Sequence, residues 1–198
     1  MPVRVEVLER QRLHDGFISV ERLRLRHALF GGGLSDVLIR EVYANRRGVG
    51  VLPYDPQHDA VILVEQFRIG ALDMPSGPWL IELIAGMVEP GETDEVVAHR
   101  ESAEEADCRL DVLWPICEYV STPGVSAETV QLYCARTDSA GLGGIHGEPK
   151  EGEDIRVHVV SMGEALEMMS NGVIQSAMPI IALQWMALNR QRIRDAWL

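Results

Sequence analysis

The sequence predicts an α+β fold in which β-strands dominate and a few helices flank them. Three observations support this class. Short apolar stretches, some alternating with polar residues, recur between Gly, Pro, Asn and Asp turns from residue 17 to residue 160. An acidic segment of helical length, residues 93–107, contains neither Gly nor Pro. Two stretches near the C-terminus carry a helix cap or amphipathic spacing, so helices should close the chain.

Residues 1–46 are expected to form a small antiparallel β unit. The stretches FISVERLRLRHALF and SDVLIREVYA alternate in part, and Gly31-Gly32-Gly33 between them suits a hairpin turn. Residues 47–198 carry the remaining elements and are expected to form a second domain. Its expected strands lie at 51–52, 60–64, 78–86, 112–120, 128–136 and 155–160, with a turn at 55–58 and a glycine-rich loop at 138–154.

Local signals mark the ends of the expected helices. Thr93 or Asp94 can cap the helix at 93–107, where acidic residues also suit the positive end of the helix dipole. Ser161 and Glu164 form a capping-box pattern for a second helix at 161–172, which Asn171-Gly172 should end. The third helix, 177–198, is amphipathic, with a Pro tolerable near its first turn.

Composition excludes several classes of protein. The net charge of −12 disfavours nucleic-acid binding by a basic face. No apolar run reaches about 18 residues, so a membrane-spanning helix is not expected. The three cysteines are odd in number and lack a C-x-x-C pair, which disfavours a disulfide framework or a zinc cluster. Together with an N-terminus that lacks a signal-like apolar run, they predict a cytoplasmic protein.

The segment from Gly86 to Asp107 holds eight carboxylates in 22 residues. Glu101 and Glu105 are four residues apart and share a helical face, with Glu104 beside them. Such like-charge pairs cost a helix about 0.2–0.5 kcal/mol each, so helix stability does not explain them. A divalent cation would, because Mg²⁺ prefers oxygen ligands and typically uses one or two carboxylates with substrate phosphates. The alternative is a solvated acidic helix face.

The spacing favours the metal. Gly86, five residues, Glu92, seven residues, the pair Arg100-Glu101 and then Glu104-Glu105 resemble the Nudix box, G-x5-E-x7-R-E-U-x-E-E-x-G-U, where U is apolar. The resemblance implies a Nudix hydrolase, with an α/β/α sandwich fold, that cleaves a nucleoside diphosphate linked to another moiety.

Two positions depart from the box. Ser102 occupies an apolar place, and Asp107 occupies the place of the final Gly. Gly there would end the helix in a left-handed conformation, which Asp adopts at a cost of roughly 1 kcal/mol relative to Gly. These departures concern helix geometry and leave the carboxylates intact.

The resemblance extends over roughly residues 15–198 and is to the ADP-ribose pyrophosphatase branch of the family. It implies Mg²⁺, with Mn²⁺ as a possible substitute, and a homodimer in which the N-terminal β unit is swapped and completes the substrate site. The implied metal ligands are the carbonyl of Ala85 and the carboxylates of Glu101 and Glu105, with Arg100 and Glu104 as further catalytic-site residues. The implied substrate-binding residues are Arg68, which would hold phosphate, Phe17, which would stack on adenine, Glu128, which would contact the terminal ribose, and Met87. Arg40 is implied to reach the site from the N-terminal unit, in the partner chain of the dimer.

A general base for water must come from elsewhere, because diphosphate hydrolysis needs a proton acceptor as well as neutralised oxygens. The loop before the strand at 155–160 offers Glu148, Glu151 and Glu153. By the resemblance, Glu151 corresponds to the base and Glu153 to a nearby metal-facing carboxylate.

Three functions are weighed. The first is hydrolysis of ADP-ribose to AMP and ribose 5-phosphate. The second is hydrolysis of GDP-mannose or another nucleotide sugar, and the third is a catalytically silent module that binds ADP-ribose. The intact Glu101 and Glu105 pair argues against the third.

Overall fold

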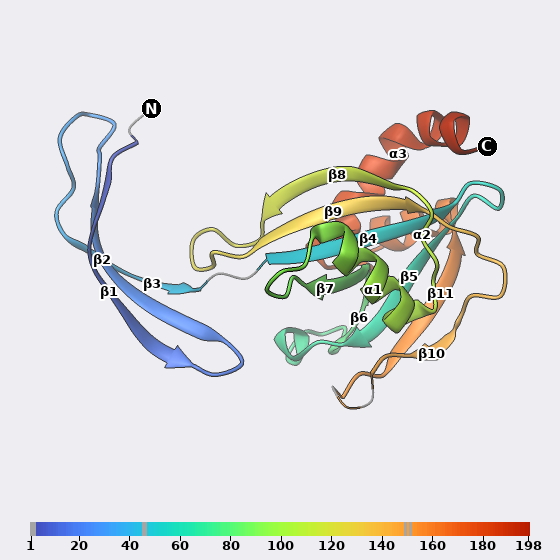
Figure 1. Cartoon of the computed structure of the whole chain (residues 1–198), viewed down its shortest axis with the longest axis horizontal. Helices are drawn as coiled ribbons and strands as arrows, with labels where there is room; N and C mark the ends of the chain where they lie inside the picture. The colour runs from blue at the N-terminus through green and yellow to red at the C-terminus, as the bar shows by residue number, and fades with distance from the viewer. Residues whose placement is uncertain (1–2, 45–46, 149, 151) are drawn as a thin grey trace. The chain divides into compact units, whose positions relative to one another are not determined.

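The computed structural model describes residues 3–44, 47–148, 150 and 152–198, and the chain is an α+β protein (Figure 1). It forms two compact units. The first contains Met1–Arg47 and Val120–Thr129, and the second contains Gly48–Tyr119 and Val130–Leu198. Within the described residues, no helix is both long and apolar enough to cross a membrane.

The first unit is a three-stranded antiparallel sheet of β1 (Val5–Asp15), β2 (Ser19–His27) and β3 (Leu38–Tyr43), with β2 in the centre. The expected glycine turn between β2 and β3 is confirmed, since Gly32 and Gly33 have φ of 92° and 79°. The strand β1 was not expected. Nearly all of its residues are exposed, so no buried face marks it in the sequence. Its antiparallel pairing with β2 holds it in place.

The second unit is built on an eight-stranded sheet whose main order is β10-β11-β5-β4-β9-β8, with β6 paired to β5 and β7 paired to β4. Its strands are β4 (Arg47–Asp55), β5 (Ala60–Phe67), β6 (Trp79–Glu82), β7 (Ile84–Met87), β8 (Leu113–Val120), β9 (Thr129–Arg136), β10 (Gly144–His146) and β11 (Ile155–Ser161). Its helices are α1 (Asp94–Ala106), α2 (Met162–Ser170) and α3 (Ala177–Trp197), with a 3₁₀ turn η1 (Ile69–Ala71).

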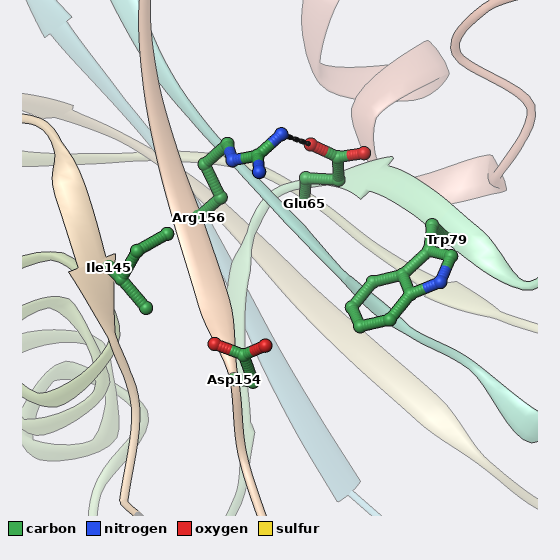
Figure 2. Close-up of a pocket in the computed structure, with 5 residues that line it drawn as sticks. All are labelled: Glu65, Trp79, Ile145, Asp154 and Arg156. Carbon is green, nitrogen blue, oxygen red and sulfur yellow. Dashed lines mark hydrogen bonds and ion pairs between the residues drawn. The ribbon is translucent and has the colours of Figure 1, made fainter.

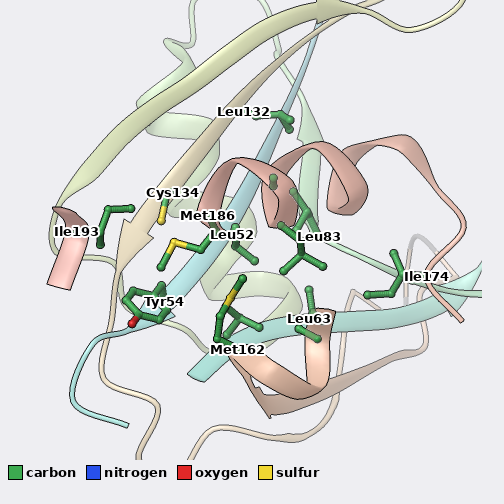
Figure 3. Close-up of a cluster of buried hydrophobic side chains, with 14 of the residues drawn as sticks. Leu52, Tyr54, Leu63, Leu83, Leu132, Cys134, Met162, Ile174, Met186 and Ile193 are labelled. Carbon is green, nitrogen blue, oxygen red and sulfur yellow. The ribbon is translucent and has the colours of Figure 1, made fainter. Parts of the chain in front are cut away.

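Both faces of this sheet are covered. Alternate residues of β5 divide between two apolar clusters, because successive side chains of a strand point to opposite faces. Ile62 and Val64 join the cluster that contains α1 residues, whereas Val61 and Leu63 join the cluster that contains α2 and α3 residues (Figure 3). Helices therefore lie on opposite faces of one sheet, as expected for an α/β/α sandwich, and β5 is a nearly continuous apolar run.

Two expectations for the second unit were wrong. Residues 78–86 form two short strands, and β6 and β7 pair with different neighbours, β5 and β4. The chain steps from one partner to the other around the buried Leu83. The glycine-rich loop is interrupted by β10, which pairs with the start of β11. The break between β6 and β7 was not predicted because the sequence there is almost continuously apolar. The strand β10 was not predicted because glycines are frequent around it.

The expected helix ends are largely confirmed. Thr93, rather than Asp94, caps α1, and its Oγ1 accepts a hydrogen bond from the N–H of Val96 at 3.4 Å. The Ser161 hydroxyl accepts the N–H of Glu164 at 3.1 Å at the start of α2. The helix α1 therefore begins directly after the loop that follows β7, which sets its acidic face against that strand.

Candidate active site

The end of α1 adopts the backbone conformation that the sequence predicts. Asp107 has φ 47° and ψ 33°, in the left-handed region. Its N–H donates to the Ala103 carbonyl at 3.1 Å, and the N–H of Cys108 donates to the Ser102 carbonyl at 2.8 Å. These bonds satisfy carbonyls that a helix end would otherwise leave free. The Ser102 side chain is buried, and its hydroxyl has no hydrogen-bond partner among the described residues, so this departure carries a polar cost.

Arg100 is the structural centre of the acidic segment. Its Nε and Nη2 donate to the two carboxylate oxygens of Glu92 at 3.0 and 3.1 Å. Its Nη1 donates to Glu101 at 2.7 Å and to Glu104 at 3.2 Å, and Nη2 also reaches the Met87 carbonyl at 3.4 Å. Arg100 therefore forms ion pairs with Glu92, Glu101 and Glu104. One guanidinium fixes the loop, the strand end and the helix relative to one another.

Gly86 allows β7 to approach α1. A Cβ built on this residue would lie 1.6 Å from Oε1 of Glu101, so no larger residue fits without displacing that carboxylate. The first glycine of the box is therefore required by space, and the space it leaves is filled by a candidate metal ligand.

Glu105 is buried beside the same strand. It accepts a hydrogen bond from the N–H of Ala85 at 3.1 Å. Burial raises the pKa of Glu105 to about 8, and the negative charges of Glu101 and Glu153 add to this although the Ala85 bond opposes it. Burial likewise raises the pKa of Glu101, with Arg100 opposing. Both carboxylates are thus charged at a cost, which a cation between them would remove.

The loop carboxylates are only partly described. Glu151, the residue that corresponds to the base, lies outside the described residues. Glu153 is described, and its charge contributes to the raised pKa of both Glu101 and Glu105. Its Oε2 accepts the N–H of Glu148 at 3.1 Å. The charge of Glu153 therefore acts on both carboxylates, and its role as a metal-facing group stays a prediction.

Arg68 is held by a residue that the sequence did not single out. Its Nε donates to Oε2 of Glu82 at 2.5 Å, and Glu82 is buried on β6. The positive charge of Arg68 also acts to lower the pKa of Glu105. An acidic residue inside the apolar stretch WLIELI was the available signal, because a buried carboxylate needs a partner. Arg68 is thus positioned near the carboxylate pair.

The remaining candidates belong to the first unit. Phe17 is exposed between β1 and β2, and Arg40 is exposed on β3, where its Nη1 donates to the Ile39 carbonyl at 2.8 Å. The Glu128 backbone N–H donates to the Ser126 hydroxyl at 3.1 Å. Their part in substrate binding stays a prediction.

The donor set fits a hard divalent cation. The candidate ligand atoms are all oxygens: the Glu101 and Glu105 carboxylates, the Ala85 carbonyl and, nearby, the Glu153 carboxylate. Such ligands suit Mg²⁺ and related ions. Ionising two neighbouring carboxylates, Glu105 buried and Glu101 partly buried, has an energetic cost that is seen in their raised pKa values and that cation binding would offset.

Comparison with known proteins agrees with this geometry. The NUDIX domain model matches residues 44–178. The ADP-ribose pyrophosphatase of Haemophilus influenzae is 43% identical over 98% of this chain and 90% of its own, and that of Escherichia coli (strain K12) is 40% identical over 98% and 92%. The GDP-mannose pyrophosphatase of Cronobacter sakazakii is 34% identical over 75% of this chain and 78% of its own.

The fold agrees as well. The crystal structure of an ADP compounds hydrolase matches with a TM-score of 0.72 at 17% identity, covering 98% of both chains, which is a likeness of fold alone. Within the matched residues, Glu101 lies against Gly86, and Arg100 pairs with Glu92, Glu101 and Glu104. The chain belongs to the Nudix family.

Proposed function

We propose that this chain hydrolyses the diphosphate of ADP-ribose to AMP and ribose 5-phosphate in a Mg²⁺-dependent reaction, with Mn²⁺ as a possible substitute. The observation that carries the proposal is the pair of carboxylates on α1, Glu101 against Gly86 and Glu105 bound to the Ala85 N–H, both with raised pKa values. Similarity over almost the whole chain to two ADP-ribose pyrophosphatases supports this substrate.

Glu101, Glu105 and the Ala85 carbonyl would hold the cation. When bound, Mg²⁺ neutralises diphosphate oxygens and makes a coordinated water more acidic. Arg100 keeps the Glu101 carboxylate in place through a hydrogen bond from its Nη1. Arg100 is itself held by two hydrogen bonds, from Nε and Nη2, to the Glu92 carboxylate. The chain thus supplies a preorganised anionic site whose shape does not depend on the substrate.

Arg68 would hold a phosphate oxygen of the substrate. Glu82 fixes its Nε, and neither Nη group donates a hydrogen bond within the part of the chain that the structure describes, so both can donate to an anion. Arg40, Phe17, Met87 and Glu128 complete the proposed substrate site, with Arg40 provided by the first unit of a partner copy in a homodimer.

Glu151 would accept the proton of the attacking water. A loop position suits a group that reaches the site only with substrate bound. Glu151→Gln is expected to lower kcat at least 100-fold with little change in KM, a loss that general-base catalysis typically accounts for. Near-normal turnover would assign the role to Glu153, for which the matched variant is Glu153→Gln.

A substrate panel tests the proposal. ADP-ribose, GDP-mannose, NADH and diadenosine polyphosphates are each incubated with and without Mg²⁺, and AMP or the corresponding products are measured. We expect metal-dependent hydrolysis with the highest kcat/KM for ADP-ribose. Preference for GDP-mannose, the substrate in the name of a 34% identical relative, would replace the substrate assignment. No metal-dependent hydrolysis of any compound would contradict an enzymatic function.

A further inference from the structure

A cavity of about 340 Å³ opens on the sheet of the second unit (Figure 2). Four neighbouring strands and the residue before one of them line it. The lining residues are Glu65, Trp79, Ile145, Asp154 and Arg156. Its volume is at the lower end of that of small-molecule sites, which suits a ligand the size of a nucleoside.

The strand register places this cavity on the face of the sheet away from α1. Val64 and Ile155 belong to the apolar cluster that contains α1 residues. Their neighbours Glu65 and Arg156, which pair directly across β5 and β11, therefore point to the opposite face. Because Glu105 lies on α1, the sheet separates the cavity from the proposed hydrolytic site.

The cavity has an aromatic wall. Trp79 is 50% exposed, and its ring meets Phe67 edge to face, with centroids 5.9 Å apart and an interplanar angle of 74°. Phe67 is its direct cross-strand partner, so the indole is braced from one side. In Figure 2, Trp79 and Ile145 lie on opposite sides of the cavity. A half-exposed indole facing an aliphatic side chain suits a planar ring, which stacks on the indole.

The charges of the cavity favour a donor and not a phosphate. Oε2 of Glu65 accepts from Arg156 Nη1 at 3.3 Å and from His158 Nε2 at 3.0 Å, so the one guanidinium lining the cavity is already paired. The Asp154 carboxylate has no hydrogen bond or ion pair among the described residues, and Figure 2 shows it at the end of the cavity away from that pair. An open carboxylate repels anions and accepts N–H donors.

We propose that this cavity binds a nucleobase with an N–H donor edge, guanine best, at a site separate from the proposed hydrolytic site. Stacking on Trp79 accepts any base. Asp154 selects among bases, since guanine offers two parallel N–H donors that match a carboxylate, as a guanidinium does, whereas adenine offers only its amino group and uracil one ring N–H.

Calorimetric titration of the full chain with guanosine, adenosine and uridine, in EDTA, tests the proposal. We expect guanosine to bind at least fivefold more tightly than adenosine, and uridine most weakly. Asp154→Asn should remove the guanosine preference, and Trp79→Leu should weaken binding of all three nucleosides at least fivefold. Trp79→Phe, which keeps a stacking ring, should retain binding within threefold, and Asp195→Asn on α3 is the matched surface control.

Saturating guanosine should leave the affinity for ADP-ribose, measured in EDTA, within twofold. The proposal is overturned if no nucleoside binds to the wild-type chain, if binding is unaffected by Asp154→Asn and Trp79→Leu, or if ADP-ribose displaces guanosine. The substrate panel is read separately, so a chain that binds guanosine but hydrolyses nothing contradicts only the hydrolytic proposal.

Discussion

Two buried carboxylates of the second unit, Asp55 and Glu105, have opposite surroundings. Asp55 accepts hydrogen bonds from the backbone N–H groups of Gln57 at 2.9 Å, His58 at 3.1 Å and Ser139 at 2.9 Å. It also accepts from the Ser139 hydroxyl at 2.6 Å and contacts His58 Nδ1 at 2.8 Å. Burial acts to raise the pKa of Asp55, but these donors outweigh it and hold the pKa well below its usual range.

Burial raises the pKa of Glu105, its negatively charged neighbours add to this, and the single N–H that it accepts, from Ala85, does not offset them. Proximity of ligand atoms would by itself point to the Asp55 region: within the described residues, Asp55, His58 and Asp138 form the one group of three acidic or histidine side chains whose possible ligand atoms lie within 4.8 Å of one another. The number of hydrogen-bond donors around each carboxylate distinguishes the Asp55 region from the Glu105 region. Asp55 is already satisfied by the protein and anchors turns, whereas Glu105 keeps acceptor capacity for the cation proposed above.

The largest effect should come from Glu105→Gln. Removing a ligand charge from the proposed cation site should lower kcat/KM for ADP-ribose on the order of 10³-fold, since a catalytic metal contributes several kcal/mol and each 1.36 kcal/mol is tenfold. The variant should keep or exceed the wild-type melting temperature without metal, because the folded wild-type chain must either protonate or ionise Glu105 inside the protein and the neutral amide removes that cost. Steady-state kinetics and melting curves in EDTA measure the two effects.

Asp55→Asn is the matched control for activity. Its kcat/KM should stay within about threefold of wild type, because the Asp55 contacts lie within turns away from the box. Equal losses of activity in Glu105→Gln and Asp55→Asn would show that donor count does not distinguish a metal site from a structural carboxylate here.

The free energy of unfolding should fall in Asp55→Asn, although this variant keeps its activity. Asp55→Asn replaces charge-assisted hydrogen bonds, so we expect a loss of about 2 kcal/mol in the free energy of unfolding at pH 7. A lowered folded-state pKa contributes stability above the unfolded-state pKa of 3.8, and that contribution is lost as the pH falls below it. Urea unfolding at pH 7 and pH 3 should therefore show the gap between wild type and variant shrinking at the lower pH. An equal difference in the free energy of unfolding at both pH values would show that the variant loses stability through packing and not through the charge of Asp55.

Metal affinity should depend on pH over a higher range, because the pKa of Glu105 is raised whereas that of Asp55 is lowered. Glu105 has a raised pKa of about 8 without metal, so below that pH a cation must displace its proton. The apparent Kd for Mg²⁺ should fall about tenfold per pH unit from pH 6 to 8 and then level, as one proton is released per ion. Calorimetry in two buffers of different ionisation enthalpy measures the proton release. A Kd that is flat over pH 6–9 would mean that Glu105 is already ionised.

Much of the site could be predicted because its signals are local. Glu101 and Glu105 share a face through helical spacing alone. The roles of Thr93 as the helix cap and of Asp107 as the left-handed helix end follow from their places at the two ends of the same segment. Glu82 could not be assigned in this way, because its role depends on pairing with Arg68 fourteen residues earlier. Such a contact is set by strand register, which one sequence specifies only through long-range packing.

The fold shows the same limit. The strand β1 has no apolar alternation, and its existence depends on a partner strand. The break between β6 and β7 depends on which neighbour each strand meets. Periodicity predicts elements that bury one side of themselves, but it is silent about elements held mainly by ladder hydrogen bonds.

The smallest effect concerns the helix end, where a second comparison is available. Asp107 and Asp59 are the two non-glycine residues with positive φ in the described chain, at 47° and 52°. The Asp59 carboxylate accepts from the Tyr54 hydroxyl at 2.6 Å and from Arg190 Nε at 2.9 Å. The Asp107 side chain makes no hydrogen bond or ion pair with a described residue. Glycine would relieve the backbone at both positions but would remove side-chain bonds only at Asp59.

Asp107→Gly should therefore stabilise the protein by about 1 kcal/mol, the cost of the left-handed conformation in a residue with a Cβ. Asp59→Gly should instead destabilise it, because the lost bonds to Tyr54 and Arg190 outweigh the same relief. Chemical denaturation of both variants measures the difference. The kcat/KM of Asp107→Gly should stay within about threefold of wild type, since the carboxylates of α1 lie before the helix end. A large rise in activity would show instead that Asp107 strains the box, and that the glycine usual at this place serves catalysis as well as the helix.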